Sequence, residues 1–246
     1  MYVTGKDYMI SSRYSTLPPS AQSQGEPQPP LELPVPAGAT VIPLPKPQEV
    51  KLPPQDLPGL IEKRRTLRHY KQDPISLEEL SFFLWASQGV ERVSSRPVTM
   101  RTVPSAGARH AFETYLLINQ VESMKQGLYR YAAIDHALVE ISLDPEWNPR
   151  LTHACLDQNQ VATSAVTFFW VAILERMYWR YSERSYRYLH LDAGHVCQNL
   201  YLAAEAANCG VCAIAAFDDE LVNDALGLDG DTQFAIYVAS LGKREE

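Results

Sequence analysis

A run of basic residues at positions 63–71 carries the residue types that bind anions most readily. It reads Lys-Arg-Arg-Thr-Leu-Arg-His-Tyr-Lys, in a chain of 246 residues whose formal net charge is −7. On a helix, Arg64 and Arg68 would share a face, with Arg65 beside them. Thr66 would add a hydroxyl. Because guanidinium groups can grip phosphate oxygens bidentately, this cluster suits a phosphate monoester better than a nucleic-acid backbone. A solvated run of charges is the simpler alternative.

Small residues dominate a second segment, Pro-Ser-Ala-Gly-Ala-Arg-His at positions 104–110. It lies between an expected loop and an expected strand. Glycine and other small residues let a backbone approach a flat ligand closely. The candidate contacts are Pro104, Ser105, Ala106 and Gly107. An ordinary turn is the alternative.

Cys209 and Cys212 form a Cys-x-x-Cys pattern within positions 208–217. A redox pair normally lies at the start of a helix, where the dipole lowers a thiol pKa, but this one follows an expected helix. A zinc site would need a second pair of ligands, and His195 and Cys197 fall in the stripe of that helix, where His195 is expected as a core histidine. We therefore expect neither a dithiol nor a metal site.

Composition limits the classes of protein that this chain can belong to. The acidic balance argues against general nucleic-acid binding, and no apolar run approaches the roughly 20 residues needed to span a bilayer. The first residues show no apolar signal core, and four cysteines are too few for a disulfide framework. The sequence therefore predicts a cytoplasmic protein with no membrane partner.

Proline divides the chain into two parts. Residues 1–58 hold thirteen of the 18 prolines, which exclude an interior helix or a central strand. We expect residues 1–54 to form an extended arm, laid over the body or over a partner subunit, with a disordered tail as the alternative. Residues 55–246 are expected to form one domain.

The rest of the chain mixes helices with hairpins and shows no regular βα repeat, so it favours an α+β fold. Ser76 and Glu79 form a capping box that opens a helix ending at Gly89, and residues 90–103 are expected as a loop. The other expected helices are 56–65, 149–161, 191–208 and 219–226. The expected strands are 114–121, 127–131, 137–143, 166–174, 211–217 and 234–241.

Several segments, in the same order along the chain, resemble the nitroreductase superfamily, whose members bind FMN. Arg-Arg-Thr-Leu-Arg-His-Tyr at positions 64–70 resembles its Arg-Arg-Ser-x-Arg-x-Phe opening. Thr-Val-Pro-Ser-Ala-Gly at 102–107 resembles the SagB-like dehydrogenase branch. The most specific match to that branch is the Tyr- and Arg-rich stretch at 178–188 followed by Leu-Asp-Ala-Gly-His-Val-Cys-Gln-Asn-Leu at 191–200. The resemblance covers about residues 55–244.

The resemblance implies a nitroreductase-like fold, with a central, mostly antiparallel sheet flanked by helices, in a homodimer with flavin at the interface. The basic cluster would hold the FMN phosphate, and residues 104–107 would reach the flavin across that interface. Backbone N–H groups of Ala213, Ile214 and Ala215 would face flavin N5 and O4. Gln158 would read the pyrimidine edge, and Lys243 or Arg244 would join the phosphate grip. An exposed amide and a frayed terminus are the alternatives for these last contacts.

Arg180 and Tyr181 stand where azoline dehydrogenases of this branch carry a Lys-Tyr pair. Arginine stays protonated and is a poor base. The resemblance therefore implies that Tyr181 exchanges the proton of a thiazoline or oxazoline ring, with Arg180 stabilising its phenolate. A packing role for the Tyr181 ring is the alternative.

The leading interpretation is an FMN-dependent, SagB-like dehydrogenase that transfers hydride to or from flavin N5 of a small molecule or peptide. An NAD(P)H-dependent nitroreductase or quinone reductase is the first alternative. The second is a flavin-binding subunit of a peptide-modifying complex, with the arm as its docking element.

Overall fold

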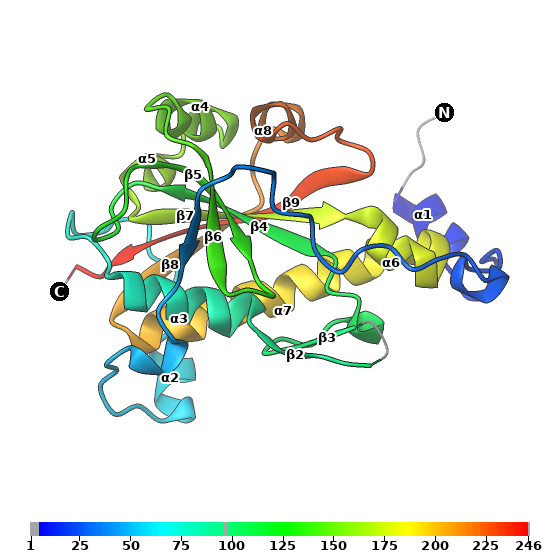
Figure 1. Ribbon diagram of the computed structural model, residues 1–246, viewed down its shortest axis with the longest axis horizontal. Coiled ribbons are helices and arrows are strands. Elements are labelled where there is room, and N and C mark those ends of the chain that lie inside the picture. The colour runs from blue at the N-terminus through cyan, green and yellow to red at the C-terminus, as the bar shows by residue number, and fades with distance from the viewer. Residues whose placement is uncertain (1–4, 96–97, 246) are drawn as a thin grey trace.

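The computed structural model describes residues 5–95 and 98–245 (Figure 1). Seven strands form one sheet in the order β1-β6-β5-β4-β7-β9-β8, and its strand pairs are antiparallel. The strands are β1 Val41–Pro43, β4 Phe112–Ile118, β5 Gly127–Ala132, β6 Ala137–Ser142, β7 Val166–Ile173, β8 Cys209–Ile214 and β9 Gln233–Lys243. The predicted α+β fold with a central antiparallel sheet is confirmed.

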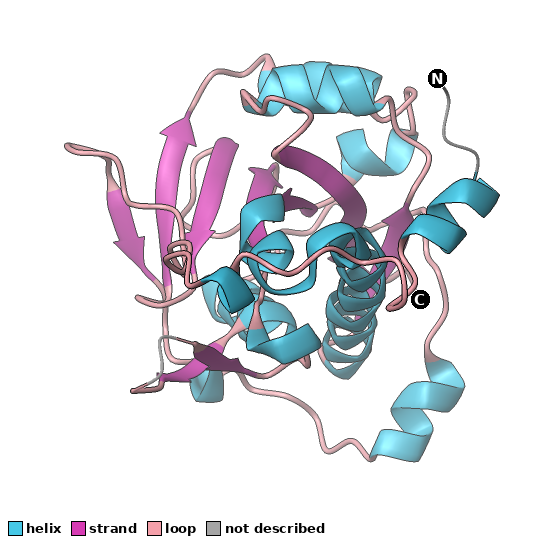
Figure 2. Ribbon diagram, turned by 90° about the vertical axis from the view of Figure 1, so that its right-hand side faces the viewer, coloured by secondary structure: helices cyan, strands magenta, loops and turns pink. Residues whose placement is uncertain are grey.

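Helices cover both faces of this sheet (Figures 1 and 2). On one face lie α3 Leu77–Gln88 and α7 Ser185–Ala206. On the other lie α4 Trp147–Ala154, α5 Asn159–Thr163 and α8 Asp219–Leu226. The central strand β7 is buried along its whole length, so its continuous apolar run serves two cores. Phe168 and Trp170 belong to the core under α3 and α7, and Phe169 and Val171 belong to the opposite core.

The capping box predicted for α3 is confirmed. Ser76 Oγ accepts a hydrogen bond from the Glu79 N–H at 3.1 Å, and Glu79 Oε2 accepts one from the Ser76 N–H at 2.8 Å. The helix ends at Gln88 before Gly89. The predicted hairpin of β5 and β6 and the predicted range of α8 are also confirmed.

The basic run is not helical, and this part of the prediction is wrong. Helix α2, Leu57–Lys63, ends before Arg64, whose ψ of 124° is extended. The following segment runs along the edge of β8 instead, where Thr66 bridges Val211 and the Leu67 N–H donates to the Val211 carbonyl oxygen at 2.9 Å. In an extended segment alternate residues share a side, so Arg64, Thr66 and Arg68 still point the same way.

Three further predictions about elements are wrong. The helix expected at 149–161 is divided into α4 and α5, with residues 155–158 outside either helix. Residues 90–103, expected as a loop, hold a two-stranded antiparallel ladder of β2 Val90–Val93 and β3 Thr99–Arg101. These strands are short and mostly polar, so they show no sustained alternation of apolar and polar residues. Their hydrogen bonding to each other is what makes them strands. Helix α7 begins at Ser185, six residues earlier than expected, just after α6 Leu174–Tyr181 and a 3-10 turn.

The proline-rich segment lies over the body of the same chain and includes the short helix α1, Gly5–Ser11. Arg184 Nη1 donates to the Ser12 carbonyl oxygen at 2.8 Å, and Arg187 Nε donates to the Ser12 hydroxyl at 2.7 Å. Trp179 Nε1 donates to the Glu26 carbonyl oxygen at 2.9 Å. The arm then adds β1 to the edge of the sheet beside β6, as the blue trace shows in Figure 1. The division of the chain at residue 54 stays a prediction.

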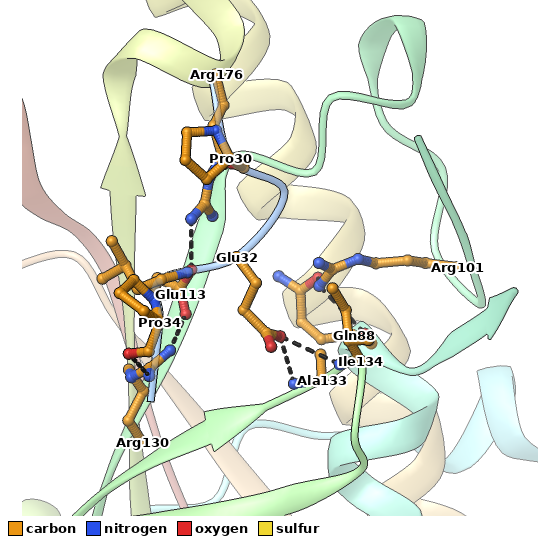
Figure 3. Close-up of polar contacts among 11 residues, drawn as sticks. Pro30, Glu32, Pro34, Gln88, Arg101, Glu113, Arg130, Ala133, Ile134 and Arg176 are labelled. Carbon is orange, nitrogen blue, oxygen red and sulfur yellow. Dashed lines mark hydrogen bonds and ion pairs between the residues drawn. The ribbon is translucent and has the colours of Figure 1, made fainter. Parts of the chain in front are cut away.

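A buried ion cluster holds the middle of the arm (Figure 3). The Glu113 carboxylate forms ion pairs with Arg130 Nη1 at 2.8 Å and with Arg176 Nη2 at 2.6 Å. It also accepts a hydrogen bond from the backbone N–H of Leu33 in the arm at 2.8 Å. Arg130 and Arg176 in turn donate to the carbonyl oxygens of Pro34 and Pro30. The arm is therefore bonded to charged groups of the core itself.

Across the part of the chain that the structure describes, no helix is both long and apolar enough to cross a bilayer.

Candidate active site

The basic run meets the end of β8 around the side chain of Tyr201 on α7. The Thr66 hydroxyl lies 3.1 Å from the Tyr201 hydroxyl, which accepts a hydrogen bond from the Ala213 N–H at 2.9 Å. The Arg64 guanidinium stacks over the Tyr201 ring, 5.3 Å from its centroid. Arg64, Thr66 and Ala213, which the sequence predicted as site residues, thus all contact the Tyr201 side chain. We call Arg64, Thr66, Arg68 and Tyr201 the phosphate corner.

Arg68 completes this corner from the same side of the extended segment. It is exposed, and its charge lies near Cys212 on β8. Arg65 turns the other way, because its Nη1 donates to the carbonyl oxygens of Glu62 and Arg64 at 2.7 and 2.8 Å. Arg65 therefore caps the end of α2.

The two basic residues at the end of β9, Lys243 and Arg244, are each bonded to a carboxylate. Lys243 Nζ lies 2.5 Å from Glu79 Oε1, and Arg244 Nη2 is paired with Glu205. Lys243 remains half-exposed beside the bridge between residues 71 and 243. The structure thus places both residues beside the basic segment, although their charges are already compensated.

The chain becomes exposed to solvent directly after β8. Ile214 is buried and paired with Val238, whereas Ala215 and Ala216 are exposed. Gln158 packs against this segment, because its Nε2 donates to the Ala216 carbonyl oxygen at 2.6 Å. Gln158, predicted to contact the pyrimidine edge of the flavin, therefore lies beside the segment that includes Ala215, predicted to face flavin N5.

The segment at 104–107 is fixed by a carboxylate on α7. Ser105 Oγ donates to Asp192 Oδ2 at 2.6 Å and accepts a hydrogen bond from the His110 N–H at 2.9 Å. The Ala106 N–H lies 3.3 Å from both Asp192 oxygens. Burial raises the pKa of Asp192, while the bonds from Ser105 and Ala106 oppose that rise. The carboxylate thus holds a loop whose backbone is unusual.

Three of the four residues that follow Ala106 have a left-handed backbone. The φ angles are 57° at Gly107, 52° at Ala108 and 43° at His110. Such conformations are uncommon outside glycine and persist only where surrounding contacts impose them. Strain of this kind often gathers at functional sites.

Arg180 and Tyr181 lie directly against this loop. A Cβ added to Gly107 would clash with the Tyr181 hydroxyl and would lie 2.9 Å from Arg180 Nε. The Arg180 guanidinium also lies over the Tyr181 ring, 5.7 Å from its centroid. The structure therefore brings the predicted catalytic pair and the predicted flavin-contact segment together. We call Gly107, Arg109, Arg180 and Tyr181 the loop corner.

A second tyrosine cluster adjoins the loop corner. The Tyr188 ring packs edge-on against Tyr181 at 4.7 Å, and its hydroxyl lies 2.7 Å from that of Tyr14 in the arm. Burial raises the pKa of Tyr188, but bonds from Tyr14 and Arg184 and the charges of Arg184 and Arg187 outweigh it and lower the pKa overall. A phenol whose pKa is lowered from its ordinary value thus lies beside Tyr181.

The phosphate corner and the loop corner lie far apart within one chain. Asp192 and Tyr201 are both on α7, and their separation of nine residues corresponds to about 13.5 Å along the axis and roughly half a turn around it.

Sequence reasoning missed the residues that connect these segments, notably Tyr201, Asp192, Arg109 and Tyr188. Tyr201 lies between Leu200 and Leu202 on α7 and packs against the core, so no signal in the sequence marks it. Asp192 was visible only as part of the 191–200 block.

Three residues singled out from the sequence take no part in either corner. His195 is exposed on α7, so its prediction as a core histidine is wrong. Cys209 and Cys212 are buried in β8, and burial raises the pKa of both thiols, that of Cys209 to about 12. Thiolate chemistry is therefore disfavoured there.

Comparison with known proteins assigns the family. The Nitroreductase family matches residues 61–243. MJ1384 of Methanocaldococcus jannaschii, a nitroreductase by name, is 33% identical over 205 residues, covering 83% of this chain and 97% of that protein. This chain belongs to the nitroreductase family, a family of oxidoreductases whose members generally bind FMN.

Another relative is the trifolitoxin-processing protein TfxB of Rhizobium leguminosarum bv. trifolii. It is 29% identical over 133 residues, which cover 52% of this chain and 36% of TfxB. The chain thus spans about a third of the length of that relative.

Solved structures share the fold. A nitroreductase by name from Anabaena variabilis matches with a TM-score of 0.64 and 30% identity, over 76% of this chain and 37% of that one. The E. coli microcin synthetase McbBCD complex with truncated pro-MccB17 bound matches with a TM-score of 0.61 over 100% of this chain and 89% of that one, at 17% identity.

Proposed function

We propose that this protein is an FMN-dependent dehydrogenase of the SagB-like branch, acting on a ring of a modified peptide. The observation that carries the proposal is the loop corner, where three separate sequence blocks of that branch meet. Ser105 is bonded to Asp192, and Gly107 touches the Arg180-Tyr181 pair. The similarity to TfxB, a toxin-processing protein, supports a peptide as substrate.

The phosphate corner has the chemistry that FMN requires. Arg64 and Arg68 form no ion pair with a carboxylate in residues 5–95 and 98–245, and the Thr66 hydroxyl is exposed beside them. Two guanidiniums and a hydroxyl match one terminal phosphate. The exposed backbone at Ala215 and the side chain of Gln158 would face the isoalloxazine. When bound, FMN supplies hydride exchange at N5.

The residues of the loop corner would handle the proton that accompanies hydride loss from a ring carbon next to nitrogen. Tyr181 would take that proton as its phenolate and become the neutral phenol, and Arg180, stacked on its ring, would stabilise the phenolate before the transfer. Asp192 holds the loop through Ser105, so that Gly107 leaves room for the Tyr181 hydroxyl. The left-handed loop thus orients the pair that exchanges the proton.

We infer a homodimer from the resemblance to the nitroreductase superfamily. In that dimer the loop corner of one subunit would complete the flavin site that the phosphate corner of the other begins. A monomer in solution that retains flavin at full affinity would contradict this arrangement.

An NAD(P)H-dependent nitroreductase or quinone reductase is the second candidate. The similarity to MJ1384, a nitroreductase by name, favours it. Such a reaction needs no base on the substrate, so the two candidates differ in their dependence on Tyr181. A flavin-binding subunit of a peptide-modifying complex remains the third candidate, and pull-down with and without residues 1–50 tests it.

The first test is the identity and retention of the flavin. Purified protein should be yellow, and mass analysis of the released chromophore should give FMN. Arg68→Gln should reduce flavin occupancy because it removes a phosphate contact, whereas Arg150→Gln, an exposed arginine on α4, should leave it unchanged. FAD, no flavin, or equal occupancy in both variants would refute the phosphate corner.

A further inference from the structure

Two arginine side chains lie together at Gly107 without a compensating acid. Arg109 Nε donates to the Gly107 carbonyl oxygen at 3.1 Å, while Arg180 Nε approaches the same residue from α6. In the part of the chain that the structure describes, neither forms an ion pair with a carboxylate. Burial lowers the pKa of Arg109, and repulsion from Arg180 lowers it further.

Burial makes this lack of compensation costly at Arg109, which is only 6% exposed. A charge taken out of water needs a partner, because desolvation otherwise opposes it. The Arg109 guanidinium stacks on Trp179, 5.2 Å from the ring centroid, which is a partial partner. The C-terminus of α6 adds about half a negative charge at most. Two full positive charges exceed what these groups neutralise.

A neutral donor faces the same point. The Tyr181 hydroxyl lies where a Cβ on Gly107 would clash with it, and no protein group within the described residues forms a hydrogen bond with it. Arg180 is exposed, so a small molecule can reach this place from solvent. The loop that carries Gly107 and Arg109 is held by Asp192 through Ser105. The position is therefore fixed, cationic and accessible.

We propose that Arg109, Arg180 and the Tyr181 hydroxyl bind an anionic oxygen group, a carboxylate or a phosphate, of the molecule that exchanges hydride. Guanidinium forks match the planar oxygen edges of such groups, and the phenol adds one further donor. Anion binding at this place does not depend on the proposed function. Only the identity of the molecule that bears the anionic group rests on it.

Two sources fit this chemistry, a carboxylate of a peptide and a phosphate of a nicotinamide dinucleotide. Calorimetric titration with N-acetylglycine and with inorganic phosphate, at constant chloride, distinguishes them. N-acetylglycinamide is the neutral control and should not bind. Tighter binding of N-acetylglycine indicates a peptide carboxylate, and tighter binding of phosphate indicates a dinucleotide. If neither anion binds the wild-type protein, the proposal is wrong.

Variants connect the binding to these residues. Arg180→Gln and Arg109→Gln should each weaken the anion that binds by roughly tenfold to hundredfold, since each removes charge-assisted hydrogen bonds. Arg150→Gln is the matched control, because the Arg150 guanidinium also stacks on a tryptophan at 5.2 Å, but on α4 far from Gly107 in sequence. Equal affinity in all variants would overturn the proposal.

Folding and flavin binding are separated from anion binding by two further measurements. Arg109 is buried, so its variant is compared by circular dichroism with Arg109→Lys, which keeps the charge and should keep part of the affinity. Arg180 is exposed, so its variant tests the site even if Arg109→Gln fails to fold. Flavin content is measured in the same samples. Anion binding without flavin would refute the proposed function alone, and flavin without anion binding would refute the site alone.

Discussion

Two pairs of arginines each include one residue of α6, and the two pairs differ in whether a carboxylate lies between their guanidinium groups. Arg130 and Arg176 share the carboxylate of Glu113, at 2.8 and 2.6 Å, and all three side chains are nearly inaccessible. Arg109 and Arg180 share only the backbone of Gly107. The first pair also bonds the arm, while the second pair faces solvent through Arg180.

This difference separates a structural role from a binding role. Arg130 and Arg176 are each paired with a carboxylate and closed off from solvent, so a dissolved anion does not reach them, although Arg176 Nη1 is buried without a hydrogen-bond partner among the described residues. The arginines of the loop corner have no carboxylate partner in the described part of the chain, and Arg180 is exposed. The Glu113 cluster therefore ties the arm to the core, and the loop corner is left to recognise an anion. Removing one charge should therefore lower the free energy of unfolding in the Glu113 cluster and leave it unchanged or raise it in the loop corner.

The largest expected effect concerns Tyr181 in the loop corner. Tyr181→Phe should keep flavin binding and lose substrate oxidation by about 10²–10⁴-fold, the usual cost of a lost general base. Reduction of quinones with NAD(P)H should be nearly unaffected, since it needs no such base. Single-turnover flavin reduction and flavin occupancy in both proteins measure this.

Tyr188→Phe is the comparison for that experiment, because the Tyr188 ring packs on Tyr181 and its own pKa is lowered. A large loss in Tyr188→Phe with none in Tyr181→Phe would move the base to Tyr188. Unchanged rates in both would favour the nitroreductase alternative, and loss of flavin would make Tyr181 structural.

In the Glu113 cluster, Glu113→Gln should lower the free energy of unfolding by about 3–5 kcal/mol, because it leaves two buried guanidiniums without their counter-charge. Urea denaturation measures the change. Glu175→Gln, on the exposed side of α6, is the control and should stay within about 0.5 kcal/mol of wild type.

The same variant should loosen the arm. Leu33 donates to Glu113, and Pro30 and Pro34 accept from its arginines, so cleavage by a protease near residues 30–34 should become faster. A stability loss below about 1 kcal/mol with unchanged cleavage would show that the cluster is not what holds the arm.

Sequence patterns predicted those elements whose cause is local. The Ser76–Glu79 capping box, the β5–β6 hairpin and the apolar run of β7 each follow from residues within a few positions of one another. The extended course of residues 64–68 does not, because it depends on pairing with Val211 on β8. The β2–β3 ladder likewise depends on pairing between two short polar segments.

The candidate site shows the same limit. The sequence marked residues 104–107, 180–181 and 191–200 as separate blocks, but only the fold shows that Ser105 meets Asp192, 87 positions away. Thr66 and Tyr201 are 135 positions apart, so Tyr201 could not be connected with the basic run from spacing. Arg109 was overlooked because its importance comes from burial next to Arg180, which composition does not reveal.

A smaller effect is expected at His110, which faces Arg101 and Arg109. Burial, then the charges of Arg101 and Arg109, lower its pKa to about 3. Below about pH 6.5 the unfolded chain binds a proton there that the folded chain does not, so stability falls as the pH drops from 6.5 towards 3. Between pH 7 and pH 5 the loss from this residue is about 2 kcal/mol.

His110→Asn isolates that contribution, because asparagine tolerates the left-handed φ of 43° and does not titrate. Urea denaturation at pH 7, 6 and 5 measures the free energy of unfolding of both proteins. As the pH falls, this free energy should decrease more in the wild type than in the variant. Parallel curves would mean that His110 is already protonated, or accessible, in the folded chain.

The smallest effect is expected from Arg180→Gln, and it contrasts directly with Glu113→Gln. Arg180 is exposed and lacks a carboxylate partner among the described residues, so its removal breaks no ion pair, and it relieves the repulsion that lowers the pKa of Arg109. The free energy of unfolding should therefore stay the same or rise by up to about 0.5 kcal/mol. Denaturation in low salt and in about 1 M salt checks the cause, since any gain should shrink when salt screens the repulsion. A loss above 1 kcal/mol would mean that Arg180 belongs to the folded core as Arg130 and Arg176 do, and the distinction between the two arginine pairs would then fail.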